Sequence, residues 1–214
     1  MKTILCFGDS NTWGWNPITQ QRFPRNIRWT GVLQCHLGNE YHVIEEGLCG
    51  RTTLRKDMFE RYTSGKEYLI PCLSSHKPIA LVIIMLGTND LKHRFAASAL
   101  NIAKSAGVLV KIVQRSKTGT HGTAPTVLLI APPPIKELGD YGRMFRGAET
   151  KSKEFGRLYE AVAQSSKCAF LDAAKYITSS NIDGIHFDAN EHLKLGEVVT
   201  GVVREIFQNE PISS

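Results

Sequence analysis

The stretch ILCFGDSNTWGW, residues 4–15, places a polar turn directly after a short apolar run. The turn GDSN consists of residue types that favour turns and helix caps, so the stretch predicts a strand followed by the start of a helix. It also puts the hydroxyl of Ser10 at the carboxyl end of a strand, where open α/β sheets bind their ligands. The rest of the chain has to distinguish a structural turn from a reactive serine.

Five apolar segments of strand length alternate along the chain with five segments that have helical spacing of apolar residues. The expected strands are residues 3–7, 42–45, 80–86, 126–131 and 169–172. The expected helices are residues 29–37, 66–75, 96–115, 148–166 and 190–207. This alternation predicts an α/β fold with a mainly parallel sheet and right-handed crossovers. Because no repeat or linker interrupts the pattern, we expect residues 1–214 to form one domain.

The composition is that of an ordinary globular chain, with 42% hydrophobic and 21% charged residues. The formal net charge is +6, but the basic residues are scattered among acidic ones, which favours a solvated basic surface over a nucleic-acid site. The longest apolar run, residues 79–86, has the length of a strand and is far too short to span a membrane. Nor does the short apolar run before Gly8 match a signal peptide.

The five cysteines are widely spaced and form no CxxC pair, and an odd number cannot all pair with one another. They are Cys6, Cys35, Cys49, Cys72 and Cys168. Cys6 and Cys168 lie in apolar runs, where a small buried thiol is the usual case. Reduced thiols are typical of the cytoplasm, which is therefore the expected location.

Polar blocks follow four of the expected strands. Their sequences are GDS at 8–10, EGLCGRT at 46–52, GTND at 87–90 and DGIHF at 183–187. The carboxyl ends of parallel strands meet at one edge of a sheet, so one crevice there would collect all four blocks.

A serine hydroxyl becomes a strong nucleophile when a neighbouring base takes its proton. Among the seven histidines His186 stands out, because Asp183 precedes it by three residues in a glycine-containing turn. That spacing lets the carboxylate meet one ring nitrogen and leaves the other nitrogen for Ser10. Capping of the last helix by Asp183 is the structural alternative, although Asp188, directly before that helix, is the better cap candidate.

Acyl transfer also needs hydrogen-bond donors for the negative charge that grows on the carbonyl oxygen. Gly50 can bring a backbone N–H close to a ligand, and Asn89 offers a side-chain amide. The N–H of Ser10, at the start of a helical turn, is a third candidate. A plain turn role for Asn89 stays open.

The blocks GDSN, GLCGRTT, GTND and DGIH, in this order and each after a strand, resemble those of the GDSL-type esterases and lipases, the SGNH hydrolase superfamily. Within it the chain resembles the arylesterase/acyltransferase branch, from residue 4 to about residue 207. The resemblance implies a flavodoxin-like three-layer α/β/α sandwich of about five parallel strands. It also implies a catalytic triad of Ser10, Asp183 and His186, with Ser10, Gly50 and Asn89 forming the oxyanion hole.

Two positions depart from the family pattern. Asn11 stands where the family's name has Leu, and Cys49 stands where a serine is frequent. We expect the first to affect packing and the second the pocket wall.

The predicted function is a serine esterase that hydrolyses short-chain acyl or aryl esters through an acyl-Ser10 intermediate, with acyl transfer to alcohols as a further activity. No cofactor is expected, since the sequence shows neither a metal-ligand motif nor a GxGxxG motif. The expected partner is a small ester, and resemblance to the acyltransferase branch favours a homo-oligomer. The aromatic residues expected to line the pocket are Trp13, Trp15, Phe145 and Phe187.

Three other functions stay open. The same site would serve a carbohydrate deacetylase, or a lysophospholipase or thioesterase. A non-catalytic ligand-binding module on the same fold is the alternative from another class, although it leaves Asp183 and His186 unexplained.

Overall fold

The computed structural model describes residues 1–209 and contains one sheet of five parallel strands in the order β2-β1-β3-β4-β5. The strands are β1 (Lys2–Gly8), β2 (Tyr41–Gly47), β3 (Leu81–Met85), β4 (Thr126–Ala131) and β5 (Ala169–Asp172). All five predicted strands are confirmed, β4 and β5 with their predicted bounds.

Each central strand is apolar on both faces because both faces of the sheet are covered. In β1, Leu5 and Phe7 pack into the core on one side, and Ile4 and Cys6 pack into the core on the other. Every residue of β3 is buried. A continuous apolar run, rather than an alternating one, is therefore the correct signature of these strands.

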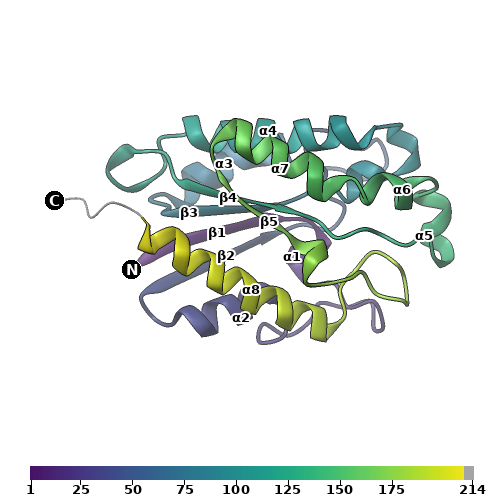
Figure 1. The fold of residues 1–214 in the computed structure, drawn as a ribbon, viewed down its shortest axis with the longest axis horizontal. Coiled ribbons are helices and arrows are strands. Elements are labelled where there is room, and N and C mark those ends of the chain that lie inside the picture. The colour runs from purple at the N-terminus through teal and green to yellow at the C-terminus, as the bar shows by residue number, and fades with distance from the viewer. Residues whose placement is uncertain (210–214) are drawn as a thin grey trace.

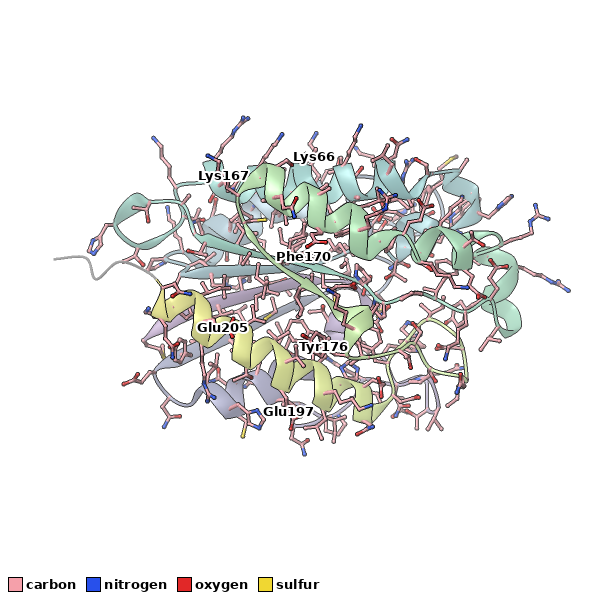
Figure 2. The ribbon with its side chains drawn as sticks, in the orientation of Figure 1. Lys66, Lys167, Phe170, Tyr176, Glu197 and Glu205 are labelled. Carbon is pink, nitrogen blue, oxygen red and sulfur yellow. The ribbon has the colours of Figure 1, made fainter. Side chains whose placement is uncertain are left out.

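Helices form the two outer layers (Figure 1). The elements α2 (Trp29–Leu37) and α8 (Ala189–Gln208) cover one face, and α3 (Gly65–His76), α4 (Ala99–Arg115) and α7 (Phe155–Ser166) cover the other. The helices are amphipathic: in α8, Leu195, Val199 and Val203 are buried. Glu197 and Glu205 of the same helix are exposed and point outward, as does Lys66 of α3 (Figure 2).

The structure corrects the helix prediction in three places. The expected helix 148–166 is two helices, α6 (Ala148–Ser152) and α7, separated by a turn at Lys153 and Glu154, whose backbone angles stay in the right-handed helical region. The short helix α1 (Ser10–Trp13) is the helical turn expected to start at Ser10, whereas α5 (Gly139–Met144) was not expected. The helix expected at 96–115 begins only at Ala99, as α4, because Ala96 has a left-handed conformation. The prediction for α2 matches its observed bounds.

The strand order places a crevice beside β1. The chain passes from β1 to β2 on one side and then returns across β1 to β3 on the other, so the connections diverge at the carboxyl ends of β1 and β3. Ser10 follows β1, and Asn89 follows β3. None of the helices within residues 1–209 has both the length and the apolar character needed to cross a membrane.

Candidate active site

Ser10 is the first residue of the short helix α1, directly after β1. Asp9 caps this helix: its Oδ1 accepts the backbone N–H of Asn11 at 2.9 Å. Burial raises the pKa of Asp9 to about 6, although that N–H and the nearby His186 and Arg51 act in the opposite direction. The GDSN segment therefore does form a turn with a helix cap, as its residue types predict. The capping residue is Asp9, so the hydroxyl of Ser10 is free to face another group.

That group is His186. Its Nε2 lies 2.9 Å from Ser10 Oγ, and its Nδ1 lies 2.6 Å from Asp183 Oδ2. All three side chains are largely buried. The structure thus brings the predicted serine, histidine and aspartate into one hydrogen-bonded chain, in which the imidazole can take the hydroxyl proton while the carboxylate holds its other nitrogen.

Asp183 is held by its own loop. Its Oδ1 accepts the backbone N–H groups of Ile185 and His186, both at 2.9 Å. Burial favours a higher pKa for this carboxyl, but the hydrogen bonds and the charge of His186 outweigh it, so its pKa lies below the usual value. The turn needs Gly184, which has φ of 76° and a backbone so close to Lys136 that an added Cβ would come within 2.1 Å of the Lys136 carbonyl oxygen.

Asp188 is the N-cap residue of α8, as predicted, but its side chain makes no capping hydrogen bond. Its Oδ1 accepts the hydroxyl of Ser180 at 2.8 Å instead. Asp183 and Asp188 therefore have separate partners.

Gly50 and Asn89 line the same cavity as Ser10. Gly50 has φ of 79°, a conformation that favours glycine. Asn89 opens a short 3-10 helix, η1 (Asn89–Leu91), and its Nδ2 donates to the carbonyl oxygen of Arg51 at 3.2 Å. That bond orients the amide and leaves its second hydrogen for a ligand.

The neighbouring Asp90 ties η1 to the loop that carries Gly50. Its carboxylate accepts the backbone N–H of Thr53 at 2.8 Å and the Thr53 hydroxyl at 2.6 Å. Burial raises the pKa of Asp90 to about 6, while the Thr53 bonds act in the opposite direction. Two of the three expected oxyanion donors, Gly50 and Asn89, thus lie on segments that are hydrogen-bonded to each other.

The cavity over Ser10 has a volume of about 290 Å³. Its apolar wall includes Trp15, whose ring centroid lies 5.5 Å from that of His186, and Tyr141, which meets the same imidazole edge-on at 6.0 Å. Phe145 and Met144 complete this wall.

Two of the four predicted pocket aromatics, Trp15 and Phe145, line this cavity, and two do not. Trp13 packs against Trp15 with the two rings tilted relative to each other and their centroids 6.1 Å apart. Phe187 is instead a core residue: its ring is fully buried against His192, in the layer between the sheet and α8. Adjacency in sequence to His186 did not bring Phe187 to the cavity, because its ring packs into the core instead.

The polar wall of the cavity was not predicted. Glu60 and Lys92 both line it, and Lys92 Nζ lies 2.6 Å from Glu60 Oε1. Glu60 Oε2 is beside Gly50, since a Cβ added there would approach it to 2.0 Å. Arg94 also binds Glu60, at 3.0 Å. No periodicity or motif marks this ion pair, because its members come from separate loops.

Asn11 and Cys49 also have defined places. Asn11 Nδ2 donates to the carbonyl oxygen of Ile185 at 3.2 Å and so connects the Ser10 turn to the His186 loop, a polar role rather than the packing role expected. Cys49 lines the cavity. Of the two thiols expected in buried strands, Cys6 is buried in β1, whereas Cys168 precedes β5 and is half-buried.

Comparisons with known proteins agree with this geometry. The sequence profile of the GDSL-like lipase/acylhydrolase family matches residues 6–193. Among solved structures, an aryl esterase from M. smegmatis is 43% identical, with a TM-score of 0.92, over 96% of this chain and 99% of that one. Est24, a carbohydrate acetylesterase from Sinorhizobium meliloti, is 42% identical, with a TM-score of 0.93, over 97% of this chain and 100% of that one.

A putative arylesterase from Agrobacterium tumefaciens is 37% identical, with a TM-score of 0.89, over 96% of this chain and 100% of that one. No curated protein sequence matches the chain.

Proposed function

Since this chain belongs to the GDSL-like lipase/acylhydrolase family and is a carboxylic ester hydrolase, we propose that it cleaves esters of short acyl groups through a covalent acyl-Ser10 intermediate. The observation that carries the proposal is the chain of contacts from Ser10 Oγ through His186 to Asp183, at 2.9 and 2.6 Å, in a small cavity.

The reaction follows from these contacts. Ser10 Oγ attacks the ester carbonyl while His186 Nε2 takes the hydroxyl proton, and the Asp183 carboxylate stabilises the imidazolium. The N–H groups of Ser10 and Gly50 and the amide of Asn89 stabilise the oxyanion. His186 then protonates the leaving alcohol, and a water molecule, activated by the same imidazole, releases the acid from Ser10.

Cavity size and wall chemistry support short acyl groups. A volume of about 290 Å³ is at the lower end for a ligand site, and the apolar wall of Trp15, Met144 and Phe145 suits an acetyl or slightly longer chain. Long acyl chains, as in a lysophospholipase or thioesterase, find no matching length of apolar wall here. Rates on p-nitrophenyl esters of increasing acyl length measure this preference.

A carbohydrate acetate is the second candidate substrate. The ion pair of Glu60 and Lys92 gives one side of the cavity hydrogen-bonding groups that an aryl ester does not use. The similarity to Est24, described as a carbohydrate acetylesterase, supports the same assignment. Comparing kcat/KM on phenyl acetate and on an acetylated sugar distinguishes the two leaving groups, and Glu60→Gln should lower only the second.

The decisive test is covalent labelling of Ser10. A fluorophosphonate should modify Ser10 in the wild type, and Ser10→Ala should lose both the label and nearly all esterase activity while keeping its circular dichroism spectrum. Undiminished labelling of Ser10→Ala would exclude this serine as the nucleophile. An unlabelled wild type would instead favour a non-catalytic binding module.

Acyl transfer to alcohols is a further part of the proposal. Trp15 lies over His186 and shields one side of the imidazole from water, so a short alcohol can compete for the acyl group. In aqueous butanol we expect both butyl ester and acid from the wild type. Trp15→Ala should accept longer acyl chains and shift the product ratio toward acid. If the wild type makes only acid, the acyl-transfer part of the proposal is wrong and the protein is a hydrolase only.

A homo-oligomer is supported by apolar side chains beside the cavity. Met58, Phe59 and Tyr62 are each at least 80% exposed and lie on the same segment as Glu60. Contact between copies through this segment would remove that apolar surface from water. Sedimentation velocity of the wild type and of Phe59→Ser measures it.

A reducing compartment such as the cytoplasm is supported by the cysteines. All five are free thiols, and Cys35 is exposed. Free thiols persist where glutathione and thioredoxin keep them reduced. Fractionation of the cells that make the protein tests this location.

A further inference from the structure

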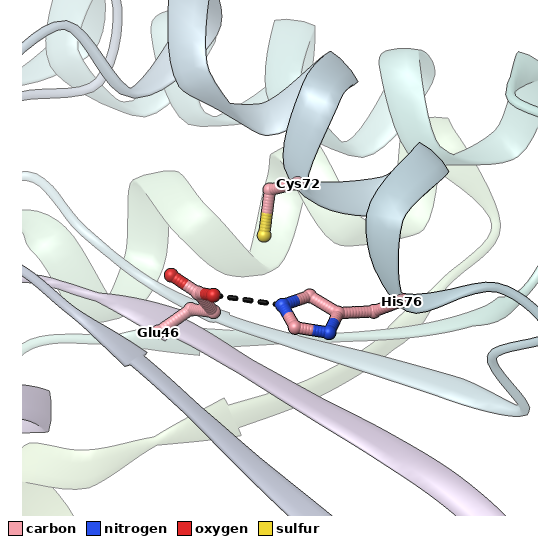
Figure 3. Close-up of side chains that lie close together, drawn as sticks. All are labelled: Glu46, Cys72 and His76. Atoms are coloured by element: carbon pink, nitrogen blue, oxygen red, sulfur yellow. Dashed lines mark hydrogen bonds and ion pairs between the residues drawn. The ribbon is translucent and has the colours of Figure 1, made fainter.

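Glu46, Cys72 and His76 lie together on the α3 side of the sheet and form no part of the active site described above (Figure 3). Glu46 is near the end of β2, while Cys72 and His76 are on α3. Because residues four apart share one face of a helix, the thiol and the imidazole both face the carboxylate. The sequence shows no metal-ligand motif here, since β2 and α3 meet only in the folded chain.

We propose that Glu46, Cys72 and His76 form a binding site for a thiophilic divalent metal ion such as Zn²⁺. The three side chains supply one oxygen, one sulfur and one nitrogen, the ligand types that Zn²⁺ takes in proteins. With water as the fourth ligand they make a tetrahedral site.

The distances between the ligand atoms are close to what such a site needs. Glu46 Oε1 is 2.8 Å from His76 Nε2, and the three ligand atoms all lie within 4.8 Å of one another. Ordinary zinc bond lengths of about 2.0–2.3 Å place tetrahedral oxygen, nitrogen and sulfur ligands about 3.3–3.6 Å apart. Small side-chain rotations are therefore enough, and the backbone of β2 and α3 can stay in place.

Access and shielding also fit a metal ion. Cys72 is buried, whereas the side chains of Glu46 and His76 are 18% and 27% exposed. An ion can thus reach the carboxylate and the imidazole from solvent and then bind the sulfur beneath them. The imidazole must offer its Nε2 lone pair, so binding replaces the hydrogen bond between His76 and Glu46, and the proton that Nε2 donates in that bond is exchanged through solvent for one on Nδ1.

Binding of the metal ion releases one proton, that of the Cys72 thiol. The Cys72 S–H bond breaks, its proton goes to solvent, and the sulfur electron pair forms the bond to the metal. Burial, with the charge of Glu46, raises the pKa of this thiol to about 12, so the free protein keeps it protonated. The ion itself therefore has to drive the ionisation.

Arg51 is the cation that faces the cluster, and it opposes a second positive charge there. Its guanidinium donates to the carbonyl oxygens of Gly8 and Glu46 and lies over the ring of Phe7. Arg51 is therefore held by backbone oxygens rather than by the Glu46 carboxylate. That carboxylate has the Tyr68 hydroxyl and the Cys72 thiol as hydrogen-bond partners, and a bound ion would replace the thiol's bond with its own. When the ion is bound, the negative charges of the Cys72 thiolate and the Glu46 carboxylate balance its two positive charges.

The test uses Co²⁺, which reports a thiolate ligand by a near-ultraviolet charge-transfer band and tetrahedral geometry by strong visible bands. Wild-type protein should show both, and Zn²⁺ should displace Co²⁺ because thiolate ligands favour Zn²⁺. Cys72→Ser should lose the charge-transfer band and weaken binding about 100-fold or more, and His76→Gln should weaken it at least tenfold. His76→Gln, at a partly exposed position, serves if Cys72→Ser does not fold.

Matched controls are Cys49→Ser in the active-site cavity and Cys35→Ser on the surface, both of which should keep the wild-type spectrum. Absence of the band in the wild type would overturn the proposal. So would a band that survives Cys72→Ser, or one that disappears in either control. Esterase activity is not used as the readout, so the result is independent of the proposed function.

Discussion

Replacing Asp183 by asparagine should disable the site through the tautomer of His186 rather than through its position. Asp183 Oδ1 accepts two backbone N–H groups, from Ile185 and His186, and Oδ2 accepts from His186 Nδ1. In Asp183→Asn the amide oxygen has to take the Oδ1 place to satisfy both N–H groups. The amide NH₂ then faces Nδ1, and the imidazole must carry its proton on Nε2, where it can no longer accept the proton of Ser10.

The expected loss is large and falls on kcat. The same exchange in the Ser–His–Asp triad of a serine protease lowers kcat by about 10⁴, which corresponds to about 5.5 kcal/mol of transition-state stabilisation. The contacts here, at 2.6 and 2.9 Å, are hydrogen bonds between the same three residue types, so we expect a loss of the same order. KM should change little, because Asp183 does not line the cavity over Ser10.

The assay is steady-state hydrolysis of p-nitrophenyl acetate by the wild type, Asp183→Asn and Asp188→Asn. Asp188→Asn is the matched control, because an amide oxygen can still accept the Ser180 hydroxyl and no capping bond is lost. It should stay close to wild-type activity. Equal losses in the two variants, or a loss confined to KM, would refute the tautomer argument.

Two further predictions concern Asn89 and His192. Asn89→Ala should lower kcat by about 10²–10³ with little change in KM on the same ester, and a large change in KM at constant kcat would make Asn89 a binding group only. Burial, followed by the charges of His186 and Arg28, lowers the pKa of His192 to about 3, so the folded protein keeps this imidazole neutral. Its contribution to stability is complete above the unfolded pKa of about 6.5 and is lost, at about 1.4 kcal/mol per pH unit, as the pH falls toward 3. In His192→Asn, whose amide oxygen can still accept the Trp29 N–H, urea denaturation should show a smaller loss of stability between pH 7 and pH 5 than in the wild type; an equal loss would contradict it.

The strands were predictable because their signal is local. A buried parallel strand reads as a short continuous apolar run, and β3 and β4 are such runs. The polar blocks after the strands were predictable as one site for the same reason, since parallel strands carry their carboxyl ends to one edge. The sequence could therefore predict that Ser10, Asp183 and His186 lie in one site.

What the sequence could not supply are contacts that only the folded chain creates. Glu60 and Lys92 belong to separate segments without periodicity, and neither stands in a motif, yet they form the polar wall of the cavity. The break between α6 and α7 is equally invisible, because residues 153 and 154 are Lys and Glu, both good helix formers.

Asn11 shows how such a contact supports the chemistry. In a pattern where leucine is the familiar residue, an asparagine at this position suggested a change in packing. Its amide instead donates to the Ile185 carbonyl oxygen, so the turn that carries Ser10 is bound to the loop that carries His186. A 2.9 Å contact between two loops from opposite ends of the chain needs supports of this kind, because a site whose supports are loose loses its reacting geometry before it loses its fold. The distance from Ser10 to His186 is thus a property of both loops and of the side chain that joins them.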